Sequence, residues 1–199
     1  MSKSVWSARL GSLWLAALVA GCGGGGADSP APAGQATSPA PAPTPAPPTS
    51  TVDATCGLSD FAASVLARVN QLRAAGASCG TRGSFAPAGP LTWSTPLTTA
   101  ATGHSIDMVT NNFFSHTGSG GSTPESRVNA TGYGWSTLGE NIAAGPMTVN
   151  AVMDGWMASD GHCANIMNPA FTQIGQACVL GSASNTYRSY WTMNLARPR

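Results

Sequence analysis

A stretch rich in glycine and proline, residues 23–55, divides this 199-residue chain into two very different parts. The stretch begins with a run of Gly, continues as Ala-Pro and Ser-Pro-Ala-Pro repeats, and contains 8 of the 15 Pro residues of the chain. Proline fixes φ and lacks a backbone donor, and the stretch has too little apolar surface to offset the entropy lost on folding. We therefore expect residues 22–55 to form an extended tether and residues 56–199 to form a single folded domain.

Residues 1–21 have the composition of a secretory signal peptide. Lys3 and Arg9 supply a positive start, and the residues of Leu10–Ala20 are almost all apolar or small. This apolar run of about 11 residues is shorter than the roughly 20 that a helix needs to span a bilayer. The pattern therefore predicts export of the rest of the chain and removal of this segment.

The end of the signal segment, Val19-Ala20-Gly21-Cys22, resembles the lipobox of bacterial lipoproteins. In such proteins the cysteine is lipidated and becomes the first residue of the mature chain, and two or more acyl chains form a stable anchor. The alternative is an ordinary secretory signal in which Cys22 is incidental. The residue after Cys22 is Gly23. In bacterial lipoproteins an Asp at this position favours another sorting route, so its absence predicts an outer-membrane location in a bacterium with two membranes. The lipid bilayer is thus an expected partner, through Cys22.

The charge of the expected domain is nearly balanced. Residues 56–199 contain seven Arg, six acidic residues and no Lys. A surface that binds DNA or RNA needs clustered positive charge to neutralise phosphates. We therefore exclude nucleic acid as a partner.

Four cysteines remain once Cys22 is assigned to lipid. An even number of cysteines in an exported chain predicts disulfide bonds. Three pairings are possible, and we expect the local one, Cys56 with Cys79 and Cys163 with Cys178, because each pair brackets one helix and its turn. A zinc site made of these cysteines is disfavoured, because the sequence lacks Cys-x-x-Cys spacing and an oxidising compartment removes free thiolates.

Apolar spacing and start signals predict helices and strands in the domain. Ser59 and Asp60 can cap a first helix, and a proline in the first turn marks two later helix starts. Alternating apolar residues predict strands near the C-terminus. The expected helices begin near residues 61, 95, 124, 149 and 160, and the expected strands are 138–144, 173–180 and 187–195. Helices followed by strands interleaved with helices indicate an α+β layered domain.

The three histidines of the chain and one glutamate are the candidates for chemistry. His116 precedes a glycine-rich loop, His162 lies at a helix start, and Glu140 lies in an apolar, strand-like segment. A carboxylate in such a segment must be paired or hydrogen-bonded. If these three residues converge, two imidazoles and a carboxylate form a site that accepts Zn²⁺ or Cu²⁺, or a site for proton transfer. His104 shares a helix face with apolar residues, so we expect it to be a core histidine bonded to the backbone.

Several short motifs, in order and at regular spacing over residues 58–197, together resemble the bacterial form of the CAP superfamily. This superfamily, also called the SCP domain, includes cysteine-rich secretory proteins, antigen 5 and plant pathogenesis-related proteins. The motifs are Val69-Asn70-x-Leu72-Arg73, Leu91-x-Trp93, His104-Ser105-x-Asp107-Met108, Phe114-Ser115-His116, Gly139-Glu140-Asn141-Ile142 and Gly161-His162-x-x-Asn165-Ile166-Met167.

The resemblance implies a three-layer α-β-α sandwich with an antiparallel sheet between helices. It also implies an open cleft lined by two His and two Glu, which binds a divalent metal in some members. His116, Glu140 and His162 match their motifs. The position of the second family glutamate, three residues after Trp156, is Ser159 here. The set of two His and two Glu that lines the family cleft is therefore incomplete in this chain.

Three functions are compatible with these residues, and the sequence does not decide whether the domain is an enzyme. The first is a binding module of the cell envelope, with an envelope or host ligand such as a lipid and a divalent metal in the cleft. The alternative is a zinc-dependent hydrolase, in which His116 and His162 hold Zn²⁺ and Glu140 is the base. Glu140 also has a structural interpretation, in which it only ties down neighbouring backbone donors. A surface adhesion or scaffold domain is a third interpretation.

Overall fold

The computed structural model describes residues 52–199, so the predicted signal peptide, Cys22 and most of the predicted tether lie outside the described residues. Hydrogen bonds attach the start of this part to the rest of the fold: Cys178 N donates to Ala54 O, and Cys56 N donates to Cys178 O. The carboxylate of Asp53 accepts from the backbone of Thr55 and Gly57. The folded domain therefore includes residues before the boundary expected at Cys56. Within residues 52–199, no helix has the length and apolar character needed to cross a membrane.

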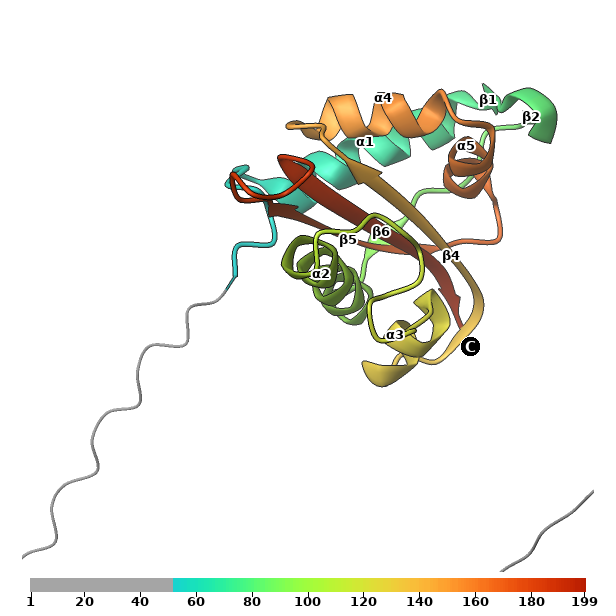
Figure 1. The fold of residues 1–199 in the computed structure, drawn as a ribbon. Coiled ribbons are helices and arrows are strands. Elements are labelled where there is room, and N and C mark those ends of the chain that lie inside the picture. The colour runs from blue at the N-terminus through green and yellow to red at the C-terminus, as the bar shows by residue number, and fades with distance from the viewer. Residues whose placement is uncertain (1–51) are drawn as a thin grey trace, which may run out of the picture. The chain divides into compact units, whose positions relative to one another are not determined.

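The domain is a mixed α+β fold with a four-stranded sheet between helices, as predicted (Figure 1). The strand order is β3-β5-β6-β4; β3 runs parallel to β5, and the other neighbours are antiparallel. A separate two-stranded sheet joins β1 and β2. The helices are α1 (Phe61–Ala75), α2 (Thr95–Thr110), α3 (Pro124–Ala130), α4 (Val149–Met157) and α5 (Asp160–Met167), with a 3-10 turn η1 (Gly80–Arg82). The strands are β1 (Ala77–Ser78), β2 (Ser84–Phe85), β3 (Thr92–Trp93), β4 (Trp135–Ala144), β5 (Gln173–Leu180) and β6 (Ser189–Pro198).

All five predicted helices form close to the expected positions, but the capping chemistry differs among them. The side chains of Thr123 and Thr148 each accept a hydrogen bond from the backbone N–H three residues later. Ser94 and Ser159 precede their helices without making a side-chain cap. Pro96 still sets the first turn of α2, because its ring holds φ near the helical value. Periodicity and proline therefore predict these helices better than the cap residues do.

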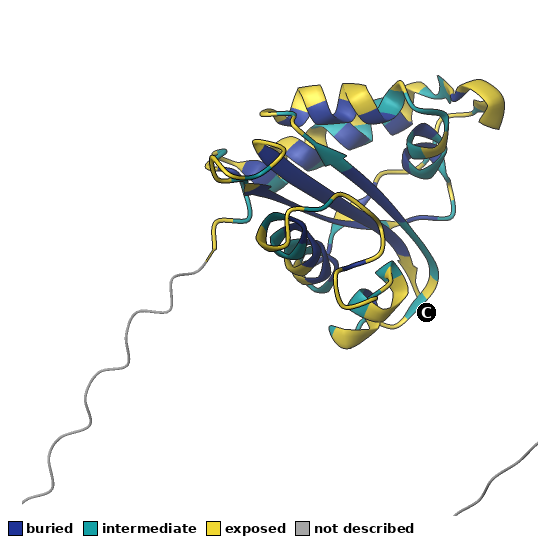
Figure 2. Cartoon of the chain, viewed as in Figure 1, coloured by how far each residue is buried: buried dark blue, intermediate teal, exposed yellow. Residues whose placement is uncertain are grey.

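The helices form two layers on opposite faces of the sheet (Figure 1). One layer contains α1, α4 and α5, and the largest apolar cluster lies between it and the sheet. The other contains α2 and α3, with a smaller cluster around Leu97 and Val128. Figure 2 shows that β6, at the centre, is buried along most of its length, whereas the outer helix faces are exposed. The predicted last strand was placed too early, because β6 begins at Ser189 and Tyr187 lies in the preceding loop.

Helix α2 packs closely on β5 because Gly175 has no side chain. A Cβ atom at Gly175 would lie 2.2 Å from the backbone nitrogen of Thr98 and 2.4 Å from the carbonyl carbon of Leu97. Such a contact would force the helix away from the sheet. The side-chain amide of Asn194 on β6 also donates to the carbonyl of Leu97, at 3.2 Å. These contacts hold the start of α2 against the two central strands.

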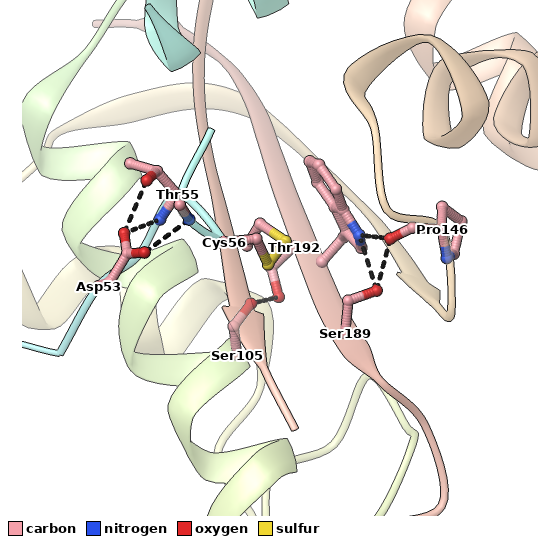
Figure 3. The surroundings of a disulfide bond; sticks show 10 residues. Asp53, Thr55, Cys56, Ser105, Pro146, Ser189 and Thr192 are labelled. Atoms are coloured by element: carbon pink, nitrogen blue, oxygen red, sulfur yellow. Dashed lines mark hydrogen bonds between the residues drawn. A yellow bond between two sulfur atoms is a disulfide. The ribbon is translucent and has the colours of Figure 1, made fainter. Parts of the chain in front are cut away.

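All four domain cysteines form disulfide bonds, but the predicted pairing is wrong. Cys56 pairs with Cys178 and Cys79 pairs with Cys163. Cys56 and its neighbours run alongside the end of β5, which places the sulfur of Cys178 within reach (Figure 3). The chain around Cys79 lies against α5, where the Asp160 carboxylate accepts from the backbone N–H of Thr81. Sequence proximity misled the prediction because tertiary packing brings distant segments together at both positions.

Candidate functional site

His116 lies in the loop after α2, and several hydrogen bonds fix this loop against the helix. The Asp107 carboxylate accepts from the backbone N–H of Ser119 at 2.9 Å and from its hydroxyl. The ring Nε2 of His104 lies 2.9 Å from the carbonyl oxygen of Ser115. The side chain of His116 itself is 51% exposed. The loop therefore presents a half-exposed imidazole from a fixed backbone.

Glu140 lies on β4, and its carboxylate is almost fully buried, with 2% of the side chain exposed. Oε1 lies 2.8 Å from Nδ1 of His116, and Oε2 accepts from Nη2 of Arg127 at 2.7 Å. The prediction that this carboxylate must be paired is confirmed. Its two oxygens bind the side chains of His116 and Arg127, so the expectation that the carboxylate ties down neighbouring backbone donors is wrong.

Arg127 is the residue of this cluster that sequence reasoning missed. It lies on α3 and connects three segments, because Nη1 donates to Ser122 O at 3.0 Å and Nη2 donates to His116 O at 3.0 Å as well as to Glu140. Its side chain is 10% exposed. The sequence did indicate that Glu140 needs a cationic partner, because a buried carboxylate is costly without one. The domain has only seven Arg and no Lys to supply it. That signal does not say which Arg is used.

The contact with Glu140 determines which nitrogen of His116 is available for chemistry. An ionised carboxylate only accepts hydrogen bonds, so Nδ1 must carry a proton. In the neutral ring, Nε2 then has a free lone pair. This is the arrangement by which a carboxylate orients a metal-binding or proton-accepting histidine.

His162 is in the first turn of α5, and two asparagines link this turn to the backbone of β4. The amide of Asn141 donates to the carbonyl of His162 at 3.1 Å, and the amide of Asn165 donates to Asn141 Oδ1 at 2.9 Å and to Glu140 O at 3.3 Å. Burial lowers the pKa of His162, and the positive charge of protonated His116 lowers it further.

The structure also bears on the predictions for His104, for Ser159 and for the metal site. His104 is fully buried and bonded to a backbone carbonyl, so its prediction as a core histidine is confirmed. Ser159 immediately precedes α5 and brings no second carboxylate to the cluster. Among residues 52–199, no group of three or more His, Cys, Asp or Glu side chains has the geometry of a metal site. The His116, Glu140 and His162 metal set remains a prediction.

Comparison with known proteins places the chain in a family. The sequence model of CAP, the cysteine-rich secretory protein family, matches residues 66–195, more than half of the chain. This chain belongs to the CAP family. The resemblance seen in its motifs is therefore confirmed at the level of the domain.

Two curated Bacillus subtilis (strain 168) proteins are similar to this CAP domain. The uncharacterized protein YkwD is 40% identical over 86 residues, which is 43% of this chain and 34% of that protein. The uncharacterized membrane protein YlbC is 31% identical over 107 residues, which is 54% of this chain and 29% of that protein. The matched part thus spans about a third of each relative, and the similarity concerns the CAP domain.

A solved structure supports the same fold. An outer surface protein from Borrelia burgdorferi has a TM-score of 0.51 and 20% sequence identity, covering 56% of this chain and 80% of that chain. At this identity the similarity concerns the fold alone.

Proposed function

We propose that this protein is an exported CAP domain that binds a ligand at the cell envelope through the cluster of His116, Glu140, Arg127 and His162. Two disulfides support export, because such bonds persist in oxidising compartments. The signal segment and Cys22 support a lipid anchor. An outer surface protein and a membrane protein are among the similar proteins, which agrees with an envelope location.

The contact between His116 and Glu140 carries the proposal. A buried carboxylate, balanced by Arg127, holds one nitrogen of a half-exposed imidazole at 2.8 Å. This leaves the other nitrogen to act on a molecule outside the protein. The exposed half of the ring is accessible to a ligand, and its position in a loop held by a rigid scaffold is typical of binding residues.

A divalent metal such as Zn²⁺ fits this chemistry. Neutral imidazoles are preferred zinc ligands, and His116 and His162 would hold the ion, while Glu140 would orient His116 from behind. A metal held by two protein ligands keeps positions open for oxygen atoms of an envelope or host ligand. In this arrangement the metal links the domain to its ligand.

The contacts of Glu140 favour binding over the hydrolase alternative. A general base needs a carboxylate oxygen within reach of the water that it deprotonates. Both oxygens of Glu140 are engaged, one by His116 and one by Arg127, and the carboxylate is buried. Ser159 supplies no replacement. We therefore propose a binding module as the function.

Zinc calorimetry on the full chain, purified without a histidine tag, tests the site. His116→Ala and His162→Ala should each weaken zinc binding more than Glu140→Gln, because Glu140 acts through His116 and such partners contribute about 10- to 100-fold in affinity. Asp154→Asn, which removes an exposed carboxylate on α4, is the control and should bind zinc like the parent. Unchanged binding in both histidine variants would overturn the metal site.

Membrane fractionation tests the anchor separately. Cys22→Ser should move the protein from the membrane pellet to the soluble fraction, while circular dichroism of the domain stays unchanged, because Cys22 precedes the folded part. Continued pelleting of the variant would contradict lipid attachment at Cys22.

A further inference from the structure

Within residues 52–199, the large hydrophobic side chains that are exposed all lie at one end of the sheet. Leu180 ends β5, and Tyr187 lies in the loop that leads from β5 to β6. The ring of Phe114, in the loop after α2, contacts that of Tyr187 with a centroid distance of 5.9 Å. We call the full set of exposed side chains the apolar rim: Val52, Phe114, Met147, Leu180 and Tyr187.

Hydrogen bonds place the other two members of the apolar rim at the same end. Met147 follows a proline whose carbonyl accepts from the hydroxyl of Ser189, the first residue of β6. Val52 comes shortly before Ala54, whose carbonyl accepts from the backbone N–H of Cys178 near the end of β5. Figure 1 shows the start of the described chain and the β5–β6 loop at the same end of the sheet. The apolar rim therefore lies beside the place where the chain enters the domain.

The aromatic pair of the apolar rim is held in place by hydrogen bonds between its two loops. The side-chain oxygen of Asn112 accepts from the backbone N–H of Thr186 at 2.8 Å. The side-chain amide of Asn185 donates to the carbonyl of Val109 at 2.6 Å. These bonds join the end of α2 to the β5–β6 loop, so the two exposed rings form a preorganised surface.

Exposed apolar groups that gather at one place mark a contact surface, and the chain itself indicates the partner. Cys22, the residue expected to carry the lipid, lies about 30 residues before Val52. An anchor at that distance makes contact between the domain and the membrane an intramolecular event, with a high effective concentration. Because the chain enters the domain beside the apolar rim, the surface nearest to the anchor is also the apolar one.

The charges near the apolar rim also suit a bilayer that contains anionic lipids. The loops after α2, β4 and β5 contain no acidic residue, and Arg188 is their only Arg or Lys. Arginine is attracted to anionic headgroups, and tyrosine is typical of the membrane interface because it combines an apolar ring with a polar hydroxyl. Asp53 is the acidic residue next to Val52, and its carboxylate accepts from the backbone of its own turn.

We propose that the apolar rim docks the domain on the lipid bilayer, with the rings of Phe114 and Tyr187 inserted among the headgroups. The choice of the bilayer rests on the lipid anchor of the proposed function. The contact is weak by itself, because it involves a few partly exposed side chains, so loss of the anchor still releases the protein on fractionation. Since His116 follows Phe114 by two residues, docking also brings the ligand-binding cluster close to the membrane surface.

The test uses the chain from residue 22 onward with Cys22→Ser, so that neither an acyl group nor the signal segment contributes to binding. Sedimentation with vesicles of phosphatidylethanolamine and phosphatidylglycerol measures its affinity for lipid, which should lie near millimolar lipid, about tenfold weaker than a single acyl chain provides. Phe114→Ser combined with Tyr187→Ser should lower this affinity about tenfold, because two partly exposed rings leave the apolar contact. Both side chains are exposed, so circular dichroism should stay unchanged.

Two matched arginine variants locate the contact. Arg188 precedes β6 and Arg197 lies near its other end, and both are exposed. Arg188→Gln should weaken binding about fivefold, as expected for one cation beside anionic lipid, whereas Arg197→Gln should bind like the parent. On vesicles of phosphatidylcholine alone, the two arginine variants should become equal, and the effect of the aromatic substitutions should remain.

Equal binding of the parent and the aromatic double variant would overturn the docking surface, as would a parent that does not sediment with vesicles at millimolar lipid. Self-association of the parent in sedimentation velocity, absent from the aromatic double variant, would assign the apolar rim to a second copy of the chain instead. None of these measurements depends on zinc or on acylation of Cys22. Failure of the docking surface is therefore distinguishable from failure of the proposed function.

Discussion

Nη1 of Arg73 lies 2.6 Å from the carbonyl oxygen of Ile166, although 93 residues separate them in sequence. The same guanidinium donates to the carbonyls of Gly89, Asn168 and Phe171. Arg73 is 1% exposed, and burial lowers its pKa. These four carbonyl bonds fasten α1 to the end of α5, to the loop between α5 and β5, and to the segment before β3.

Arg73→Met should strongly destabilise the domain. The substitution leaves buried carbonyl groups without donors, and each such group costs about 1–3 kcal/mol, so we expect a loss of about 3 kcal/mol or more. Urea unfolding under non-reducing conditions measures this change. Arg68→Met is the control on the same helix, where the partly exposed pair with Asp154 should contribute less than about 1 kcal/mol. Similar losses in both variants would contradict the anchoring role of Arg73.

The ion pair of Arg127 and Glu140 predicts that substitutions of the two residues have strongly non-additive effects on the free energy of unfolding. Arg127→Met leaves a carboxylate that is 2% exposed without its cation, which should cost about 3–5 kcal/mol of unfolding free energy. Glu140→Gln in the same chain should recover part of this loss, because the buried negative charge is then absent. A double-mutant cycle from urea unfolding measures the coupling, and additive effects would refute it.

The disulfide pairing can be read directly from peptides. Non-reducing digestion and mass spectrometry should find Cys56 joined to Cys178 and Cys79 joined to Cys163. Sequence separations of 122 and 84 residues close long loops, so replacing either pair by serine should cost about 4–5 kcal/mol in the chain-entropy model. A peptide linking Cys56 to Cys79 would contradict the structure.

His104 should make stability depend on pH. Burial lowers its pKa; the charges of Glu140 and Asp107 oppose this shift, and that of Arg127 adds to it. The unfolded state, with a pKa near 6.5, therefore binds more protons than the folded state as pH falls below about 7. The stability contributed by neutral His104 is complete above that value and is lost as pH falls through the lowered pKa.

The measurement is the free energy of unfolding between about pH 7 and pH 5. The parent should lose stability on acidification, and His104→Phe should reduce the slope by up to about 1.4 kcal/mol per pH unit. Met108→Ala, a buried change on the same helix without a titrating group, should keep the parental slope. An unchanged slope in His104→Phe would show that His104 keeps its ordinary pKa.

Local patterns predicted the elements of this fold well because their causes are local. Pro96 at the start of α2 and the periodic apolar residues up to Gly76 in α1 act within a few residues of each other. The short strands β1, β2 and β3 were missed because two residues contain no periodicity. β1 and β2 pair with each other across η1, whereas β3 depends on β5, much later in the chain.

The candidate site was predicted in part. Glu140 could be identified because a carboxylate in an apolar strand is costly unless it is paired. His116 and His162 could be selected from three histidines by their positions outside element cores. Arg127 could not be chosen from seven arginines, because it reaches Glu140 through the packing of α3 beside β4 and not through any short-range pattern.

The sequence by itself determined the helix positions, the oxidised cysteines, the family motifs and the need of Glu140 for a partner, since each depends on residue type or on near neighbours. The tertiary structure decided the identity of the partners: Cys178 for Cys56, Cys163 for Cys79, Arg127 for Glu140, and the carbonyls around Arg73. The physical reason is that these contacts depend on the strand order β3-β5-β6-β4 and on which helix covers each face of the sheet. Strand order and helix placement are properties of the whole packed chain, and they bring together residues about 80 to 120 positions apart at the disulfides.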